Sequence, residues 1–359
     1  MATYKVVDAD QLNADMTSVA DSVRTKGGTT GALAWPDGYK TAIEAIQTGG
    51  GGGGSEEEWI GDGNTHIWIS LVEGCTSPML GCCPNGTVTV DWGDGTTPDT
   101  LTGTSTSTVQ WTPTHHYAAP GDYVITLTVD GAMGFYGSSS NNQYSGILRY
   151  SSSSDNRNYA YRTAVKKIEV GGGVTSIGKY AFDSCYGLAS ITIPDNVTSI
   201  RSEAFDNCYS LASITIPDSV TSIGSYACNN CYSLASITIP DRVTSIGSYM
   251  FRACYSLASI TISDGVTKIG GEAFAYCNSL TSITIPANVT SIGSNAFQNC
   301  RSLTKLRFES ATPPAVSGSS TFSGIHTDCV ISVPVGSLAA YTSATNYPSS
   351  STYTYIEED

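Results

Sequence analysis

The sequence predicts a mainly β protein whose C-terminal half is largely a solenoid, and three observations support this. A 23-residue pattern recurs six times between Val174 and Phe308 with no change of register. Each copy contains a short stretch in which apolar residues alternate with hydroxyl residues, such as Ser-Ile-Thr-Ile at 213–216. Each copy also has one cysteine at the same place, namely Cys185, Cys208, Cys231, Cys254, Cys277 and Cys300. Units of this length bury their apolar faces by stacking on their neighbours.

Within one copy the apolar spacing changes along the chain. The alternating stretch predicts a half-buried strand that ends at Pro217, because proline lacks the N–H that a strand ladder needs. Val220 and Ile223 return to the core in a second extended piece. A third group of inward residues is spaced as in a short helix of one or two turns. In the copy that precedes Ser213 these residues are Ala204, Phe205, Cys208 and Leu211.

The unit L-x-x-I-x-I-P-x-x-V-x-x-I-x-x-x-A-F-x-x-C resembles the BspA-like leucine-rich repeat family over about 165–309, which is 40% of the chain. The resemblance implies a leucine-rich-repeat solenoid in which each 23-residue coil has one strand and a short helix. Cys228 departs from the pattern by replacing the inward Phe, and Ser263 replaces the proline. Residues 310–359 are similar to the terminal cap of such chains, with a strand at 329–334 and a helix after Ser337. The acidic end, residues 357–359, is expected to be solvated.

Composition limits the partners. The net charge is −14 and 13% of residues are charged, which disfavours nucleic acid and anionic membrane surfaces. No stretch approaches 18 apolar residues, so no membrane insertion is expected. The N-terminal sequence has no basic segment followed by an apolar run, so we expect no secretory signal and synthesis in the host cytoplasm.

The pattern of residues 1–48 predicts a small helical module. Asp8 and Gln11 form a capping-box pattern, and a second short helix follows the turn at 35–38. The stretch 19–46 resembles the N-terminal segment of structural proteins from phages of Gram-positive gut bacteria. This implies docking to other virion proteins or oligomerisation, and the alternative is a solvated helical hairpin without a docking role. The glycine-rich stretch at 49–58 predicts a flexible linker.

Residues 59–130 predict a β-sandwich by alternation and β-branched content. The motifs at 91–96 (DWGDGT) and 116–123 (HYAAPGDY) resemble the polycystic-kidney-disease (PKD) domain, an immunoglobulin-like (Ig-like) spacer. Asp91, Asp94, His115 and His116 could instead form a metal or acid–base site. The resemblance implies structural turns, so we expect no metal site, no cofactor and no catalytic residues.

Residues 131–164 are rich in Ser, Asn, Gly and Tyr and show no period. This composition fits a disordered connector or a binding loop, and both readings stay open. The tyrosines of interest there are Tyr144, Tyr150, Tyr159 and Tyr161.

The six repeated cysteines are expected to be buried thiols that act as small apolar groups, because parallel side chains in a ladder do not point at one another. Outside the ladder, the alternative is that one pair among Cys75, Cys82 and Cys83 forms a disulfide.

Two sets of repeat positions are candidates for ligand binding. One holds tyrosines after the cysteine or two residues before the Phe, and its members are Tyr186, Tyr209, Tyr232, Tyr255, Tyr180, Tyr226 and Tyr249. These rings could pack edgewise on one another, or they could stack on sugars or anchor a protein. The other set consists of Ser and Thr rows such as Ser213 and Thr215, which could bond a glycan or only keep the sheet soluble.

No nucleophile–base–acid set can be assembled from this sequence. The pattern therefore predicts a noncatalytic recognition protein, and the most specific interpretation is a phage tail-associated or fibre adhesin located in the virion. Its solenoid would bind a host-surface glycan or protein, and homo-oligomers are compatible with the N-terminal module. The alternative is a bacterial cell-surface adhesin of BspA-like type.

Overall fold

The computed structural model describes residues 62–107, 109–137, 147–149 and 157–358, and the side chains of 149 and 157–159 are not among them. The predicted docking module (1–48) and linker (49–58) lie outside the described residues. Residues from Gly61 to Asp359 belong to one compact unit. Among its described residues the regular secondary structure is almost entirely β, with helices α3 (Arg157–Ala164) and α4 (Leu338–Ser343).

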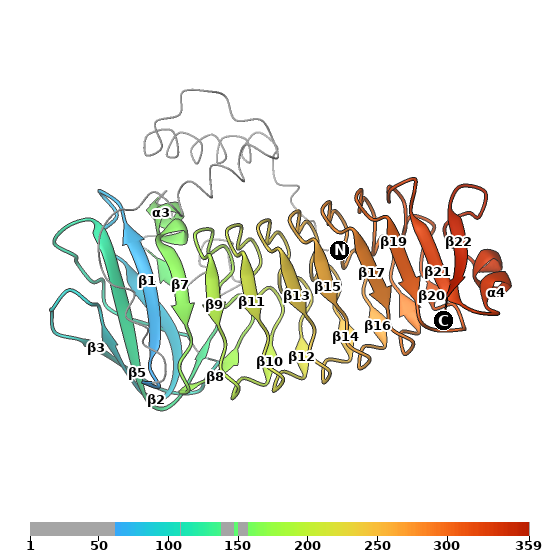
Figure 1. The fold of residues 1–359 in the computed structure, drawn as a ribbon. Coiled ribbons are helices and arrows are strands. Elements are labelled where there is room, and N and C mark those ends of the chain that lie inside the picture. Colours follow the sequence, from blue (N-terminus) through green and yellow to red (C-terminus); the bar gives the residue numbers. More distant parts are fainter. Residues whose placement is uncertain (1–61, 108, 138–146, 150–156, 359) are drawn as a thin grey trace, which may run out of the picture. The chain divides into compact units, whose positions relative to one another are not determined.

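The repeats form two rows of short parallel strands that lie side by side (Figure 1). The first row carries the predicted Ser-Ile-Thr stretches, and its strands are β7 (Val165–Glu169), β9 (Ser190–Thr192), β11 (Ser213–Thr215), β13 (Ser236–Thr238), β15 (Ser259–Thr261), β17 (Ser282–Ile285) and β19 (Lys305–Phe308). The second row consists of β8 (Val174–Ile177), β10 (Ser199–Ile200), β12 (Ser222–Ile223), β14 (Ser245–Ile246), β16 (Lys268–Ile269), β18 (Ser291–Ile292) and β20 (Ala315–Val316). Equivalent residues of neighbouring coils pair without offset, as Ser213 with Ser190. The predicted solenoid is therefore confirmed.

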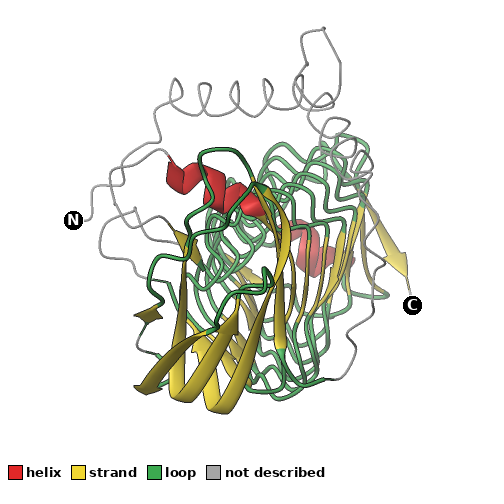
Figure 2. Ribbon diagram, turned by 90° about the vertical axis from the view of Figure 1, so that its left-hand side faces the viewer, coloured by secondary structure: helices red, strands yellow, loops and turns green. Residues whose placement is uncertain are grey.

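The short helix expected in each coil is wrong. The segment between the second-row strand and the leucine is a series of turns, which stack as loops in Figure 2. We call this segment, residues 178–187 of the first coil and its equivalents, the turn side. Alternate N–H groups bond to the next coil, as Phe182 N to Ala204 O (2.8 Å), and those between them bond three residues back, as Cys185 N to Phe182 O (3.1 Å). Two residues per coil have φ near +60°, which prevents a helix, and they are Tyr180, Ser184, Glu203, Asn207, Tyr226, Asn230, Tyr249, Ala253, Glu272, Tyr276, Asn295 and Asn299.

A layer of phenylalanine rings runs through the interior. Phe182 and Phe205 stack with ring centroids 5.4 Å apart, and Phe251 and Phe274 at 5.7 Å. Between these pairs stands Cys228, which is buried in place of a ring. In the following coil Met250 is fully buried where the other coils have alanine. The larger Met adds back part of the volume that the smaller Cys removes from this part of the core.

All eleven cysteines are described, and each is a buried thiol rather than half of a disulfide, including the three outside the ladder. Within the ladder the thiols also act as donors. Cys208 Sγ donates to Phe182 O at 3.2 Å, and Cys277 Sγ donates to Phe251 O at 3.1 Å. The same Phe182 carbonyl accepts the backbone N–H of Cys185 at 3.1 Å. A small side chain with a weak donor therefore fits this position better than a purely apolar one.

The region 62–135 is joined to the first coil by strand pairing. Its strands are β1 (Thr65–Leu71), β2 (Met79–Asp91), β3 (Asp99–Thr104), β4 (Gln110–Trp111) and β5 (Gly121–Phe135). Strand β1 pairs antiparallel with both β5 and β7, and the end of β5 pairs parallel with β8. Strand β5 thus continues past residue 130, where the sequence predicts a domain boundary. Strand β6 (Leu148–Arg149) and helix α3 follow in the stretch for which no regular structure is predicted.

At the other end β21 (Val330–Pro334) confirms the predicted strand, and α4 lies where the helix is expected. A final strand, β22 (Thr354–Glu358), pairs parallel with β21. The acidic terminus is not simply solvated. Glu357 Oε1 accepts the backbone N–H groups of Gly336 (2.9 Å) and Leu338 (3.0 Å) at the start of α4. Glu358 forms an ion pair with Arg307 at 3.2 Å.

Candidate recognition surfaces

The outward side of β9, β11, β13, β15 and β17 is an array of hydroxyl groups. The central isoleucine of each strand points into the core, and the residues on either side of it point outward. We call the outward residues the strand face, and they are Ser190, Thr192, Ser213, Thr215, Ser236, Thr238, Ser259, Thr261, Ser282 and Thr284. Nine of the ten are exposed and Ser190 is half-buried. Within the strand pairs β9–β11 and β13–β15 the rows are in register. Neighbouring hydroxyls in a row are therefore about 4.8 Å apart.

These hydroxyl groups have no hydrogen bond to another described residue. Threonines elsewhere in the same coils differ in this respect. Thr221 Oγ1 donates to Thr198 O (3.3 Å), and Thr267 Oγ1 donates to Thr244 O (3.1 Å), from one coil to the one before. Threonine next to the second-row strands thus contributes bonds between coils, whereas Ser and Thr on the strand face keep their bonding capacity for solvent or a ligand.

The tyrosines that follow the cysteines form a stacked ladder on the turn side. Tyr186 and Tyr209 have ring centroids 4.7 Å apart and planes within 3°, and Tyr209 and Tyr232 are 4.6 Å apart within 2°. Tyr255 continues the ladder at 5.0 Å with a 27° tilt. Arg162 Nη1 donates to Tyr186 Oη at 3.1 Å. The rings lie face to face, so the edgewise packing considered from the sequence is wrong.

Face-to-face stacking limits what this ladder can bind. Both faces of Tyr209 and Tyr232 are covered by neighbouring rings, and all four side chains are half-buried. Burial also raises the pKa of Tyr232 and Tyr255, so these phenols stay protonated at neutral pH. A sugar ring cannot stack on a covered face, which makes internal packing the main role of the ladder.

The tyrosines two residues before the Phe position are also engaged with neighbours. Tyr226 and Tyr249 stack at 4.4 Å with planes within 7°. The ammonium of Lys179 lies 4.4 Å from the centroid of Tyr180 and 3.5 Å from a carboxylate oxygen of Glu203. Burial raises the pKa values of Tyr180 and Tyr249. Tyr180, Tyr226 and Tyr249 also have the left-handed backbone described above, so each of them determines the path of the turn as well as lining it.

The four remaining candidate tyrosines do not form a described surface. Tyr161 is 1% exposed, and its hydroxyl accepts the backbone N–H of Ser77 at 3.0 Å, so it belongs to the core. Tyr159 is in α3, but its side chain lies outside the described residues. Tyr144 and Tyr150 also lie outside them.

The DWGDGT and HYAAPGDY motifs assemble into one structural cluster. The rings of Trp92 and His115 stack at 4.5 Å, and His115 Nε2 is 2.8 Å from Asp94 Oδ2. The hydroxyl of Tyr117 donates to Trp92 O at 2.9 Å. His116 instead contacts Ser77 Oγ at 2.9 Å. In the described part of the chain, no three His, Cys, Asp or Glu side chains are arranged to hold a metal ion.

A model of the BspA type leucine rich repeat region matches residues 153–278 and 244–334 with six copies. Together these matches span 182 of the 359 residues. The chain belongs to this family. BspA-type proteins are typically noncatalytic binding proteins of bacterial cell surfaces. No helix among the described residues is both long and apolar enough to cross a bilayer.

Several solved structures resemble parts of this BspA-type chain. A leucine rich cell surface protein from Faecalibacterium prausnitzii is 42% identical over 42% of this chain and 40% of its own, with a TM-score of 0.37. The chain thus spans less than half the length of that protein. A leucine rich repeat protein of T. pallidum is 26% identical over 49% of this chain and 83% of its own, with a TM-score of 0.39. Comparison with curated protein sequences finds no match.

Acidic groups meet on the turn side of the BspA-type coils. Burial, followed by the neighbouring Asp183 carboxylate, raises the pKa of Asp206 to about 8. Asn229 Nδ2 donates to Asp206 Oδ1 at 2.8 Å, and Asn207 Nδ2 donates to Asp183 Oδ1 at 3.4 Å. Asn229 Oδ1 is buried and accepts no bond from a described residue. Sequence reasoning missed this cluster, although Asp at equivalent positions of adjacent coils is visible in the repeat.

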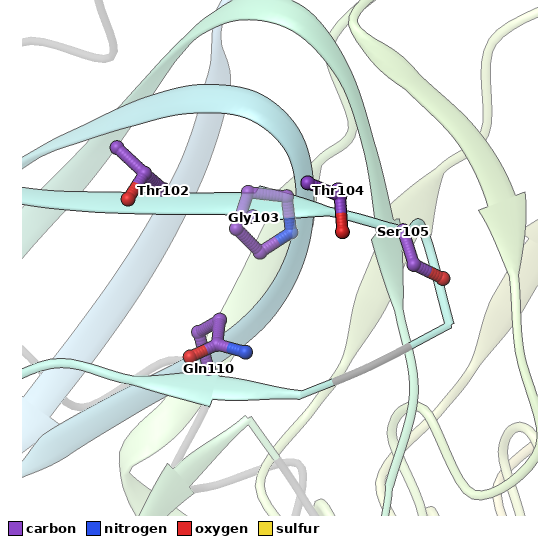
Figure 3. A pocket seen from close by; sticks show the side chains of 6 residues that line it. Thr102, Gly103, Thr104, Ser105 and Gln110 are labelled. Carbon is purple, nitrogen blue, oxygen red and sulfur yellow. The ribbon is translucent and has the colours of Figure 1, made fainter.

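The region 62–135 also contains a small pocket between β3 and β4 (Figure 3). Its lining consists of Pro84, Thr102, Gly103, Thr104, Ser105 and Gln110. None of these residues is ionisable at neutral pH, so the pocket offers hydroxyl and amide groups but no general acid or general base. The strand face, by contrast, presents ten hydroxyl groups that have no bond to a described residue.

Proposed function

We propose that this protein is a noncatalytic recognition protein that binds a cell-surface ligand through the strand face of its repeats. The observation that carries the proposal is the array of ten hydroxyl groups, which are in register within the pairs β9–β11 and β13–β15 and none of which bonds to another described residue. These ten hydroxyls make no hydrogen bond to another described residue, whereas threonines next to the second-row strands donate hydrogen bonds from one coil to the one before. A rigid sheet also presents them without the entropy cost of ordering a loop.

A more specific proposal is a phage tail-associated or fibre adhesin. Its support is the resemblance of residues 19–46 to phage structural proteins and of the DWGDGT and HYAAPGDY motifs to a PKD spacer. In this proposal residues 1–48 attach to other virion proteins, and the strand face contacts the host. The alternative is a BspA-like adhesin of the bacterial surface, which the general location of the family supports.

Co-sedimentation of the full chain with intact Gram-positive gut bacteria tests the recognition role. We expect saturable binding that is retained by a shortened chain beginning at Glu56. Immunogold labelling of phage particles and of bacterial surfaces then separates the two more specific proposals. Labelled tails support the phage adhesin, and labelled cell envelopes in uninfected cells support the surface adhesin. Absence of saturable binding to every strain would contradict recognition itself.

A further inference from the structure

A row of carboxylates follows the strand face along one edge. The proline after each strand is followed by an exposed aspartate in four successive coils, namely Asp195, Asp218, Asp241 and Asp264. None of these aspartates forms an ion pair with a described residue. We call these four residues the aspartate row.

The row is close enough to act on a bound ligand. In the coil of β13, Asp241 is three residues beyond Thr238, which is about 10 Å along an extended chain. Exposed charges are screened over a Debye length of about 8 Å at physiological ionic strength, so the repulsion is weakened at Thr238 and is strongest on the part of a ligand that lies nearest the row. Successive aspartates therefore create a continuous negative potential beside the hydroxyl array, and Arg242 is the one cation that directly follows an aspartate of the row.

Positive charge lies at the ends of the strand face, not on it. The register continues the serine row onto Lys167 at one end and Lys305 at the other. Lys167 pairs with Glu169 at 2.9 Å, and its ammonium lies 4.6 Å from the centroid of Trp68. Between these two lysines the face carries only hydroxyl side chains. An anionic polymer along the face would meet four aspartates and, beside them, the single cation Arg242, so repulsion would outweigh attraction.

The face is also a poor match for a protein partner. Protein interfaces gain most of their affinity from large aromatic or arginine anchors that fill pockets. The strand face has no aromatic, arginine or large apolar residue among its ten members. A hydroxyl group both donates and accepts, which matches the hydroxyl groups of a sugar.

We propose that the ligand of the strand face is an uncharged polysaccharide that lies across the strands, along the axis of the repeats. This rests on the proposed function of that face. The spacing of about 4.8 Å between hydroxyls is close to the length of one sugar ring, so a regular polymer can repeat the same contact from coil to coil. Each contact is weak, and affinity comes from their number.

The first experiment identifies the ligand class on cells. The full chain is tested for binding to bacteria treated with periodate, which cleaves vicinal diols of sugars, or with trypsin. We expect periodate to abolish binding and trypsin to leave it unchanged. The double variant Thr238→Lys, Thr261→Lys should lose about tenfold or more in affinity on untreated cells. If the variant binds as wild type, the proposed function of the face fails. If only the variant loses binding and periodate has no effect, the face stands and a polysaccharide with vicinal diols is wrong.

The second experiment tests the charge argument with defined polymers. Purified neutral glucans, mannans, galactans and xylans are compared with polygalacturonate and its methyl-esterified form, by affinity electrophoresis. We expect at least one neutral polymer to be retarded and polygalacturonate not to be. Replacing the four aspartates by Asn should leave retardation by the neutral polymer unchanged and increase any response to polygalacturonate. Asp130→Asn with Asp328→Asn, exposed outside the row, is the control. Retardation by polygalacturonate alone, or by no neutral polymer, would overturn the inference.

Discussion

The turn side and the strand face belong to the same coils and repeat with the same period, yet their polar groups are used differently. On the turn side, tyrosine rings cover one another, thiols bond to carbonyls, and Asp206 is held by Asn229. On the strand face, ten hydroxyls have no bond to a described residue. A regular repeat alone therefore does not indicate where a ligand binds. The side whose polar groups have no internal partner is the better candidate, and substitutions should separate the two: turn-side changes should alter stability, and strand-face changes should alter binding.

The largest effect on stability is expected in the phenylalanine layer behind the turn side. Phe274 is fully buried and stacks between Phe251 at 5.7 Å and Phe297 at 5.4 Å. Phe274→Ala should reduce the free energy of unfolding by about 3–5 kcal/mol. Thr284→Ala on the strand face should change it by less than about 0.5 kcal/mol. Chemical denaturation measures both, and equal effects would remove the distinction between the two sides.

A second change tests how the core accommodates the missing ring. Cys228→Phe should destabilise by about 1–3 kcal/mol, because the buried Met250 in the next coil leaves too little room. The double variant Cys228→Phe, Met250→Ala restores the pattern of the other coils and should recover most of that loss. Thermal unfolding of the two single variants and the double variant gives the coupling. Additive effects would show that the two residues do not share volume.

The tyrosine ladder should behave as packing. Tyr232→Ala removes two stacked pairs and should cost about 1–3 kcal/mol, since each aromatic pair contributes about 0.5–1.5 kcal/mol. Tyr232→Phe keeps the stacks and should cost much less. Cell binding by both folded variants should equal that of the wild type. A loss of binding in Tyr232→Phe without a loss of stability would return the ladder to the list of ligand-binding surfaces.

The acidic cluster on the turn side should give a pH dependence of stability. An Asp in the unfolded chain has a pKa of about 3.9, and in the fold Asp206 has a pKa of about 8. The folded state therefore holds this proton more tightly, and stability falls as pH rises between these two values. The charged groups nearby are Asp183 and Glu203, which both favour the protonated form. The melting temperature of the wild type should therefore fall as the pH rises from 5 to 8. Asp206→Asn should make this fall smaller, whereas Asp218→Asn should leave it unchanged.

The repeat itself was predictable because the strand-ending proline and the inward residues recur in nearly every coil, with Ser263, Cys228 and Met250 as exceptions. The short helix was not, since the spacing of Ala204, Phe205, Cys208 and Leu211 fits both a helix and stacked turns. The asparagines at 207, 230 and 299 were a usable signal, because Asn tolerates a left-handed backbone better than most residues.

Two further features depended on contacts that no local pattern shows. The pairing of β1 with β7 joins residues about a hundred positions apart, and the cap formed by Glu357 on α4 joins residues 19 positions apart. The candidate site divides in the same way. The Ser and Thr rows are visible in the sequence, but only the structure shows that one set of hydroxyls is bonded between coils and the other is not. The stacked faces of the tyrosines are likewise a matter of geometry.

The most direct test of the account compares two exposed positions of one coil. Thr261 lies on the strand face, whereas Thr267 lies six residues later, beside the second row, and bonds to Thr244 O. Thr261→Lys and Thr267→Lys add the same side chain to the same coil. Binding of each full-length variant to intact bacteria is measured beside its melting temperature. We expect Thr261→Lys to weaken binding about tenfold with an unchanged melting temperature, and Thr267→Lys to lower the melting temperature with unchanged binding. Equal loss of binding in both variants, or loss only in Thr267→Lys, would contradict the assignment of the strand face as the recognition surface.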